Sequence, residues 1–192
     1  MTTIPTSPEL IVEEVFALYT LHGDEDYIGE PVSQIEHMSQ AAALAEAEGY
    51  DDEVILAAFF HDLGHLCASN QAASMDGFGA VDHEKLGAEY LRERGFSDRL
   101  ANLVQGHVIA KRYLTYKHPE YYKKLSPASK ATLNFQGGVM SAAEAAQFEL
   151  NPDANLIVRM RYWDDEAKLE EIPVDNINHL MDIAINHLKR NR

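Results

Sequence analysis

Cysteine is almost absent from this sequence, which has only Cys67 among its 192 residues. One cysteine cannot form a disulfide within the chain or a cluster of thiolate ligands. Any bound metal would therefore have to be held by histidines and carboxylates. We interpret Cys67 as a small packed hydrophobic residue rather than a nucleophile.

Positive charge is also scarce. The 16 lysines and arginines stand against 31 aspartates and glutamates, which gives a formal net charge of −15. Binding to nucleic acid or to anionic membranes depends on cations that contact phosphates, so this balance argues against both partners. A small anionic substrate is still compatible with the charge, provided that metal ions and a few placed cations attract it locally.

Long apolar runs are missing as well. No stretch approaches the roughly 20 apolar residues that span a bilayer, and the first residues, Met1 to Pro5, have neither the basic region nor the apolar core of a signal peptide. We therefore expect a cytoplasmic protein. A chain of 192 residues with 46% hydrophobic content is long enough for one sizeable core and short for two, which predicts a single domain over residues 1–192.

The pattern along the chain predicts an all-α fold, because no segment shows the alternation of a β-strand and helix start and stop signals recur. Ser33 and Ser141 each begin a capping box, and Pro8 and Pro127 each follow a serine N-cap. Loops are expected at 24–31 and 68–81, where Gly and Pro or Gly and Asp cluster. The expected helices are 8–22, 33–49, one that Asp51 or Asp52 caps and that ends in the stretch 57–65, then 82–94, 97–113, 127–136, one from 141, one through 156–163 and 175–189.

The stretch Ala57–His65 is the centre of the sequence. An apolar helical run ends there in His61 and Asp62, followed by Gly64 and His65. Imidazole and carboxylate ligands suit iron, manganese or zinc, and a carboxylate can bridge two ions. A His-Asp pair alone is a weak signal, because such dipeptides are common.

Other histidines lie at expected helix ends among apolar residues, namely His37, His83 and His107, and the pair Asp164-Asp165 follows Trp163. One such histidine is more often a satisfied core residue than a ligand, but the whole group favours a metal centre. The order of His37, His61-Asp62 and Asp164 resembles the HD-domain superfamily, with His83 and His107 as the additions of its binuclear members. The resemblance implies a helical bundle around a dinuclear site whose ligands are His37, His61, Asp62, His83, His107 and Asp164, with Asp62 as the bridge.

The residues around these ligands resemble a narrower family, the mixed-valent di-iron HD oxygenases that cleave the carbon–phosphorus bond of 1-hydroxyalkylphosphonates. The matching stretches cover about residues 24–168, which would form the core of the domain with the terminal helices packed on it. They are Asp26–Glu30, Phe60–His65, His83–Lys85, Gly106–Leu114, Phe135–Gly138 and Arg161–Asp164.

This resemblance implies two iron ions, Fe(II) and Fe(III), with O2 as co-substrate. It also implies a small hydroxyphosphonate substrate that is split to inorganic phosphate and a carboxylate. Two substrates of the family fit: 2-amino-1-hydroxyethylphosphonate, which yields glycine, and its trimethylammonio counterpart, which yields glycine betaine. We favour the trimethylammonio compound, because Tyr27, Glu30, Asp76 and Phe78 offer the aromatic faces and carboxylates that a quaternary ammonium prefers.

The resemblance further implies roles outside the ligand set. Lys111, four residues after His107, and His65 would bind the phosphonate, and Tyr27 and Glu30 would move when substrate arrives, Glu30 meeting its cationic nitrogen. Without the resemblance, Lys111, His65 and Tyr27 would be interpreted as a surface lysine, a helix-terminal histidine and a packed loop tyrosine. Three further residues match positions near the phosphonate or the ligands: Ser129, Gln136 and Arg161.

Three other functions are compatible with parts of this pattern. A metal-dependent HD phosphohydrolase acting on a nucleotide or small phosphate ester would use the same ligands, but would release phosphate without O2. An oxygenase acting on a polyol would not need His65 and Lys111. A helical regulator descended from the enzymes would be expected to have lost ligands, whereas all six positions are filled.

Overall fold

The computed structural model describes residues 6–27, 29–67, 75, 77 and 80–191. These residues form helices and no β-strand, apart from one isolated bridge between Asp26 and Ser33, so the all-α prediction is confirmed. None of the helices described is both long and apolar enough to cross a membrane. The helices are α1 (Pro8–His22), α2 (Gln34–Ala47), α3 (Asp52–Phe60), α4 (Leu63–Cys67), α5 (His83–Glu93), α6 (Asp98–Lys117), α7 (Pro119–Lys124), α8 (Pro127–Phe135), α9 (Ala142–Glu149), α10 (Ala154–Glu166) and α11 (Ile177–Arg190).

Six helices begin at the residues that the sequence predicts, because their N-cap side chains accept a backbone N–H of the first turn. Ser33 and Ser141 form the two expected capping boxes, with Glu36 and Glu144. The other four N-caps are Ser7, Asp51, Ser97 and Ser126.

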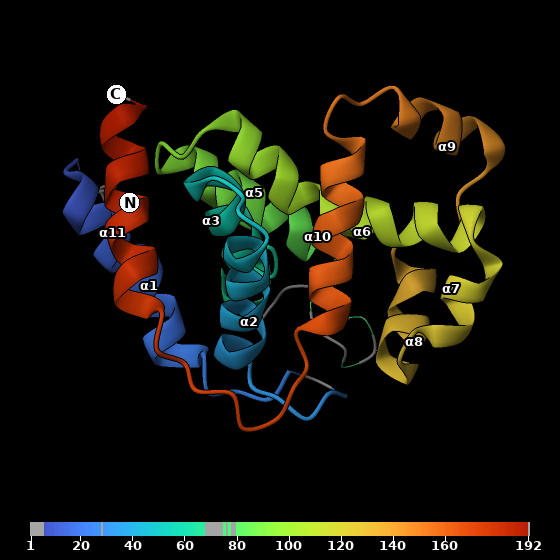
Figure 1. Ribbon diagram of the computed structural model, residues 1–192, viewed down its shortest axis with the longest axis horizontal. Coiled ribbons are helices and arrows are strands. Elements are labelled where there is room, and N and C mark those ends of the chain that lie inside the picture. The colour runs from blue at the N-terminus through green and yellow to red at the C-terminus, as the bar shows by residue number, and fades with distance from the viewer. Residues whose placement is uncertain (1–5, 28, 68–74, 76, 78–79, 192) are drawn as a thin grey trace.

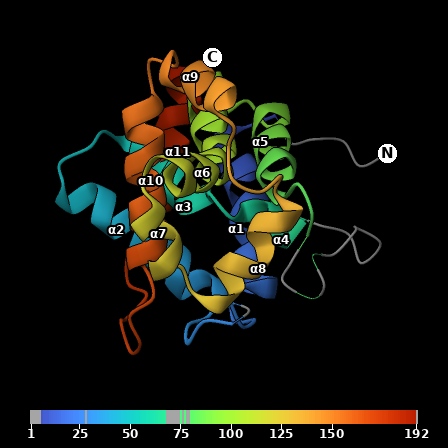
Figure 2. The same ribbon diagram turned by 90° about the vertical axis from the view of Figure 1, so that its right-hand side faces the viewer.

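The helix α6 contacts five of the other ten helices among the described residues. It lies across the view in Figure 1 and is seen end-on in Figure 2. The helices α3, α5, α7, α9 and α10 pack against it, and α2 packs against both α3 and α10. At the far end α1 and α11 lie side by side, near both chain termini (Figure 1).

One hydrophobic cluster draws on helices from α1 to α11. At its centre Phe16 and Tyr19 of α1 stack against Phe59 of α3, with ring centroids 5.4 and 4.5 Å away. Trp163 of α10 is fully buried and donates its indole N–H to Glu48 over 3.0 Å. These contacts fix α2, α3 and α10, the helices from which several of the predicted ligands come.

Two short helices were not predicted, and one predicted helix was too short. The chain turns at His61 and Asp62, so α4 is separate from α3 rather than its continuation. The helix α6 extends past the predicted end at Tyr113 to Lys117, where Pro119 ends it and begins the six-residue α7. Most of the predicted loop 68–81, including Asp76 and Phe78, lies outside the described residues.

Candidate metal centre and its cavity

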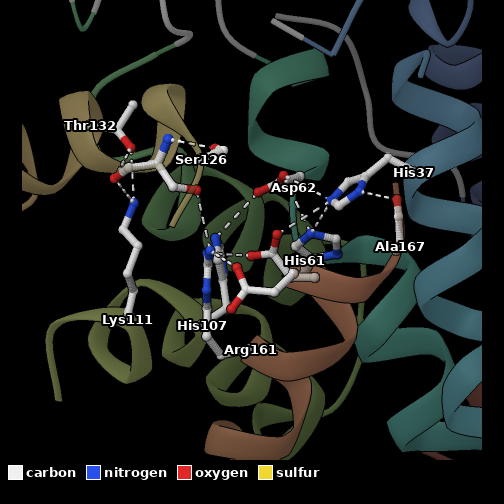
Figure 3. Close-up of polar contacts among 12 residues, drawn as sticks. His37, His61, Asp62, His107, Lys111, Ser126, Thr132, Arg161 and Ala167 are labelled. Carbon is white, nitrogen blue, oxygen red and sulfur yellow. Dashed lines mark hydrogen bonds and ion pairs between the residues drawn. The ribbon is translucent and has the colours of Figure 1, made fainter. Parts of the chain in front are cut away.

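The six predicted ligands come from five parts of the fold and meet in the core. His37 lies in the first turn of α2, His61 and Asp62 at the turn between α3 and α4, and His83 at the start of α5. His107 lies in the middle of α6, and Asp164 lies near the end of α10. All six side chains are buried, at most 3% exposed. Figure 3 shows His37, His61, Asp62 and His107 converging.

The ligand atoms form two groups of three. The first group comprises His37, His61 and Asp164, and the second comprises Asp62, His83 and His107. Within each group the ligand atoms lie within 4.8 Å of one another. The Asp62 carboxylate spans both groups. Its Oδ2 lies 3.3 Å from His61 Nε2, and its Oδ1 lies 3.2 Å from Nε2 of both His83 and His107. This is the arrangement of a bridging carboxylate.

All four histidines share one tautomer, because each Nδ1 faces a backbone carbonyl that can only accept a proton. The Nε2 atom of each ring is then left with a free lone pair, which is the form that binds a metal. Three of the carbonyls belong to the residue three positions earlier in the chain. The Nδ1–oxygen distances are 2.8 Å from His37 to Ala167, 2.7 Å from His61 to Ala58, 3.3 Å from His83 to Ala80 and 2.7 Å from His107 to Val104.

The lone pairs point at one another. The Nε2 atoms of His37 and His61 lie 3.0 Å apart, and those of His83 and His107 lie 3.1 Å apart. Two acceptors at this distance repel each other unless a proton or a metal ion lies between them. In the same place the buried Oδ1 of Asp164 has no hydrogen-bond partner and lies 3.6 Å from His37 Nε2. The donors therefore fit a dinuclear metal centre.

The pKa shifts follow the same geometry. Burial lowers the pKa of His37 to about 4, so its ring is neutral at pH 7. For His61, burial is outweighed by the neighbouring carboxylates, above all Asp62, which raise the pKa to about 9. Burial would also raise the pKa of the Asp164 carboxyl, but the Arg161 guanidinium holds it well below its usual range. The carboxylates thus attract a cation to this group.

Gly64 allows the two halves of the centre to approach each other. A Cβ atom added there would lie 1.8 Å from the backbone oxygen of His83 and 2.9 Å from the backbone nitrogen of Gly87. Only glycine permits this contact between α4 and α5, and the contact places Asp62 beside His83. Sequence reasoning did not identify the role, although a glycine between Asp62 and His65 was a signal for it.

A small cavity of about 60 Å³, partly open to solvent, adjoins both ligand groups. The cavity is lined by the three ligands of the second group, Asp62, His83 and His107, and by Asp164 of the first group. All seven residues predicted to bind substrate line it as well. Those seven are Tyr27, Glu30, His65, Lys111, Ser129, Gln136 and Arg161. The structure brings them together, and their individual roles stay predictions.

Lys111 is a buried cation that has no acidic partner among the described residues. Its side chain is 2% exposed, and Nζ donates to Thr132 Oγ1 over 2.9 Å and to the Ser129 carbonyl over 3.4 Å (Figure 3). No carboxylate of the described residues lies within ion-pair distance of it. Burial, followed by the charge of Arg161, lowers its pKa to about 7. Thr132, which the sequence did not single out, fixes the position of this ammonium.

His65 is held as a neutral hydrogen-bond donor. Its Nδ1 accepts the Ala80 N–H over 3.2 Å, so the proton must lie on Nε2. The ring stacks on His83 with centroids 3.9 Å apart, and burial lowers its pKa to about 3. Because α4 is a separate helix, His65 reaches the cavity from its own element rather than from the face of α3.

Arg161 is a buried guanidinium whose donors are largely occupied. It bonds Asp164 Oδ2 over 2.6 Å, pairs with Asp165, and donates to the Tyr121 hydroxyl over 2.9 Å. It therefore orients Asp164 more than it offers a free charge. Ser129 Oγ lies 3.4 Å from Arg161, and the buried Oε1 of Gln136 has no hydrogen-bond partner. Both side chains line the cavity.

Tyr27 and Glu30 lie on the side of His37. The Tyr27 ring stacks on the His37 ring with centroids 4.0 Å apart. Burial and the nearby carboxylates of Asp62 and Asp164 raise the pKa of its phenol well above the usual value. The Glu30 carboxylate forms an ion pair with Lys168 at 2.7 Å, a partner that the sequence did not predict.

Comparisons with known proteins agree with this geometry. Residues 35–133 match the model of the HD domain. The chain is 41% identical to the [1-hydroxy-2-(trimethylamino)ethyl]phosphonate dioxygenase (glycine-betaine-forming) of Leisingera caerulea, over 88% of this chain and 86% of the relative. It is 37% identical to the hydroxymethylphosphonate dioxygenase of Gimesia maris, over 91% and 87%. An uncharacterized protein of Acanthamoeba polyphaga mimivirus is 41% identical over 92% and 81%.

The chain belongs to the HD-domain family. Within that family its similarity to two dioxygenases extends over most of both chains, well beyond the region matched by the domain model. The protein is accordingly an oxygenase with a dinuclear metal centre.

Proposed function

We propose that this enzyme uses O2 to cleave the carbon–phosphorus bond of a small 1-hydroxyphosphonate and releases inorganic phosphate. The main support is Lys111, a buried ammonium without an acidic partner among the described residues, which opens onto the cavity shared by both ligand groups. A cation kept unpaired at a metal centre suits an anionic substrate. The named activities of the two dioxygenase relatives point to the same class of substrate.

The metals of this proposal are two irons, one Fe(II) and one Fe(III). His37, His61 and Asp164 would hold one, His83 and His107 would hold the other, and Asp62 would bridge them. Bound iron would supply the one-electron chemistry with O2 that amino-acid side chains cannot perform. The histidine and carboxylate donors suit iron, but also manganese and zinc, so metal analysis of the purified protein is the direct measurement.

The phosphonate would bind at the end of the cavity formed by α6 and α8. There Lys111 offers an ammonium, His65 offers its Nε2–H, and Ser129 offers a hydroxyl. Burial lowers the pKa of Lys111 in the free protein. A dianion beside Lys111 would raise this pKa again, because the opposite charge favours the ammonium. Gln136, with its unpartnered Oε1, would accept a hydrogen bond from the 1-hydroxyl or a protonated phosphonate oxygen.

Tyr27 and Glu30 would control entry to the metals from the other side. The phenol of Tyr27 lies beside Asp62 and over His37, in space that a substrate bound to the metals would need. The tyrosine would therefore have to move when substrate binds. We interpret Glu30 as the group that then meets a cationic nitrogen on the substrate.

The substrate that we favour is 1-hydroxy-2-(trimethylammonio)ethylphosphonate, with glycine betaine as product, and the second is 2-amino-1-hydroxyethylphosphonate, with glycine as product. The first matches the named substrate of one dioxygenase relative. The net charge of −15 supports the further proposals that nucleic acid and membranes are not partners. A cytoplasmic location is also a proposal.

One experiment separates this function from the phosphohydrolase alternative. Iron-loaded protein is given each hydroxyphosphonate, and separately a nucleoside monophosphate, with O2 and under strict exclusion of O2. We expect phosphate only from a hydroxyphosphonate and only with O2, together with one equivalent of the amino acid. Phosphate release in the absence of O2 would contradict the proposal and favour hydrolysis.

A further inference from the structure

Lys168 connects the segment after α10 to the residues that cover the metal centre. Its Nζ lies 2.7 Å from Glu30 Oε1 and 5.7 Å from the centroid of the Tyr27 ring. The side chains of Lys168 and Glu30 are only 15% and 11% exposed, so this pair is better shielded from solvent than most ion pairs on the protein. One lysine thus contacts both Tyr27 and Glu30.

The backbone around Lys168 is fixed from both sides by α2. The carbonyl of Ala167 accepts the Nδ1–H of His37 over 2.8 Å. On the other side the amide of Gln40 exchanges two hydrogen bonds with the backbone of Leu169, at 3.0 and 3.1 Å. The segment is thereby held against the helix that carries His37, and the position of the ammonium is defined by the metal centre's own framework.

Glu30 is positioned from its own side. Its backbone N–H donates to the Tyr27 carbonyl over 2.9 Å, and the Tyr27 N–H donates to the Val32 carbonyl over 2.9 Å. The carboxylate lines the substrate cavity at the side where Tyr27 stacks on His37. Figure 3 shows His37 and Lys111 on opposite sides of the metal-ligand cluster. The cavity therefore has at one end a cation, Lys111, that no described carboxylate pairs with, and at the other a paired carboxylate, Glu30.

A shielded carboxylate does not release its cation without a replacement, because an unpaired charge in such a place is costly. A ligand that brings its own cation to this end of the cavity can replace Lys168, and the number of charges at Glu30 is then unchanged. A ligand without a cation leaves the pair of Glu30 and Lys168 intact. The pair therefore distinguishes two kinds of phosphonate.

We propose that Lys168 is a specificity-determining residue, whose ammonium occupies on Glu30 the place that a substrate's cationic nitrogen would take. This inference rests on the proposed function, since it assumes that a phosphonate group binds at the Lys111 end. Lys168 opposes the binding of phosphonates that carry a cation and is neutral toward those that do not. The strength of the ion pair between Lys168 and Glu30 sets the enzyme's preference between these two kinds of phosphonate.

The test compares two phosphonates without a 1-hydroxyl group, 2-aminoethylphosphonate and methylphosphonate, which differ in the ammonium and do not depend on turnover. Their dissociation constants are measured by calorimetry on metal-loaded wild-type protein and on Lys168→Ala, Lys168→Arg and Lys117→Ala. Lys117 forms an ion pair of similar length, 2.9 Å to Glu149, neither residue lines the cavity, and Lys117 therefore serves as the control. A fifth protein combines Lys168→Ala with Glu30→Gln.

We expect Lys168→Ala to increase the preference for 2-aminoethylphosphonate over methylphosphonate by about tenfold. Lys168→Arg and Lys117→Ala should keep the wild-type ratio, and adding Glu30→Gln should remove the gain. A merely structural role would weaken both ligands equally. A ratio that stays the same or falls in Lys168→Ala overturns the inference for Lys168 alone. If neither phosphonate binds wild-type protein, the phosphonate site itself is wrong, and this inference falls with it.

Discussion

Gly64 and His83 are in backbone contact, so that a Cβ atom on Gly64 would lie 1.8 Å from the His83 carbonyl oxygen. This contact joins α4 to α5 directly after the turn that carries Asp62. The metal centre therefore depends on a glycine that offers no ligand of its own.

Replacing this glycine is expected to damage the second ligand group more than the first. In Gly64→Ala the clash is with backbone and cannot be relieved by a side-chain rotation, so α4 and α5 must separate. We expect a loss of about 3 kcal/mol or more in the free energy of unfolding and a metal content reduced toward one ion per chain. Thermal denaturation and elemental analysis of the purified variant are the measurements.

Gly106→Ala is the comparison for that variant. The atoms nearest to a Cβ at Gly106 belong to the Ile157 side chain, at 2.8 Å, and not to the backbone of another helix. The loss of stability should be smaller and the metal content close to that of the wild type. Equal damage in the two variants would contradict the role assigned to Gly64.

Asp62 is expected to control the binding of both ions. Its two oxygens face different ligand groups, at 3.3 Å from His61 and 3.2 Å from His83, so Asp62→Asn weakens both sites. We expect fewer than one metal ion per chain in Asp62→Asn, but about one in His83→Ala, which removes a ligand from one group only. Two full equivalents of metal in Asp62→Asn would refute the bridge.

Removal of the metals is expected to destabilise the protein. Without a metal ion the Oδ1 of Asp164 is buried with no hydrogen-bond partner among the described residues, and the Nε2 atoms of His37 and His61, 3.0 Å apart, need a proton between them. Treatment with a chelator should lower the midpoint of thermal unfolding, and adding iron should restore it with a dependence on metal concentration. A midpoint that does not respond to metal would argue against a resident centre.

Lys111 should make phosphonate binding dependent on pH. Its pKa of about 7 in the free protein means that the ammonium is lost as the pH rises above 7. The affinity of the wild type for methylphosphonate should then fall by up to about tenfold per pH unit. Lys111→Met lacks this titration, so the pH dependence of its affinity should reflect the ligand alone. In turnover, Lys111→Met should lower kcat/KM by about 10- to 100-fold. Parallel pH profiles of the two proteins would contradict this prediction.

His187 should make the attachment of α11 sensitive to acid. Its Nε2 accepts the Ser97 N–H over 3.2 Å, and chiefly burial lowers its pKa, while Glu53, Asp52 and Asp51 oppose the shift and Arg190 supports it. Because the folded pKa lies below the unfolded one, of about 6.5, the unfolded state binds the extra proton first. The stabilisation is therefore complete above pH 6.5 and is lost as the pH falls below it.

His187→Gln, which keeps an acceptor but does not titrate, is the control. The wild type should lose more stability than this variant between pH 7 and pH 5, and hydrogen exchange in α11 should accelerate only in the wild type. An equal loss in both proteins would place the acid sensitivity elsewhere.

Much of the fold followed from local chemistry. Serine and aspartate N-caps and the two capping boxes identified six helix starts correctly, because a cap is encoded within four residues. The α7 helix and the break between α3 and α4 were missed, since pieces of five or six residues leave no periodic pattern. Most of these boundaries are set by tertiary packing instead.

For the site, the sequence identified the set of residues but not their supports. All six predicted ligands converge, and all seven predicted binding residues line one cavity. The partners that hold them were beyond reach, because Lys168 meets Glu30 across 138 positions and Thr132 meets Lys111 across 21. Such pairings depend on how helices cross, which no local pattern reports.

The carbonyls behind the four metal-facing histidines come from Ala58, Ala80, Val104 and Ala167, so the proton on each ring is placed by main chain alone. Where a carboxylate side chain accepts the ring proton instead, a single substitution removes the acceptor. Here no replacement of the side chain at these positions can remove the acceptor, and only a movement of the backbone can. In a saturation scan, positions 58, 80, 104 and 167 should tolerate residues that fit the space. The four histidines should tolerate no replacement.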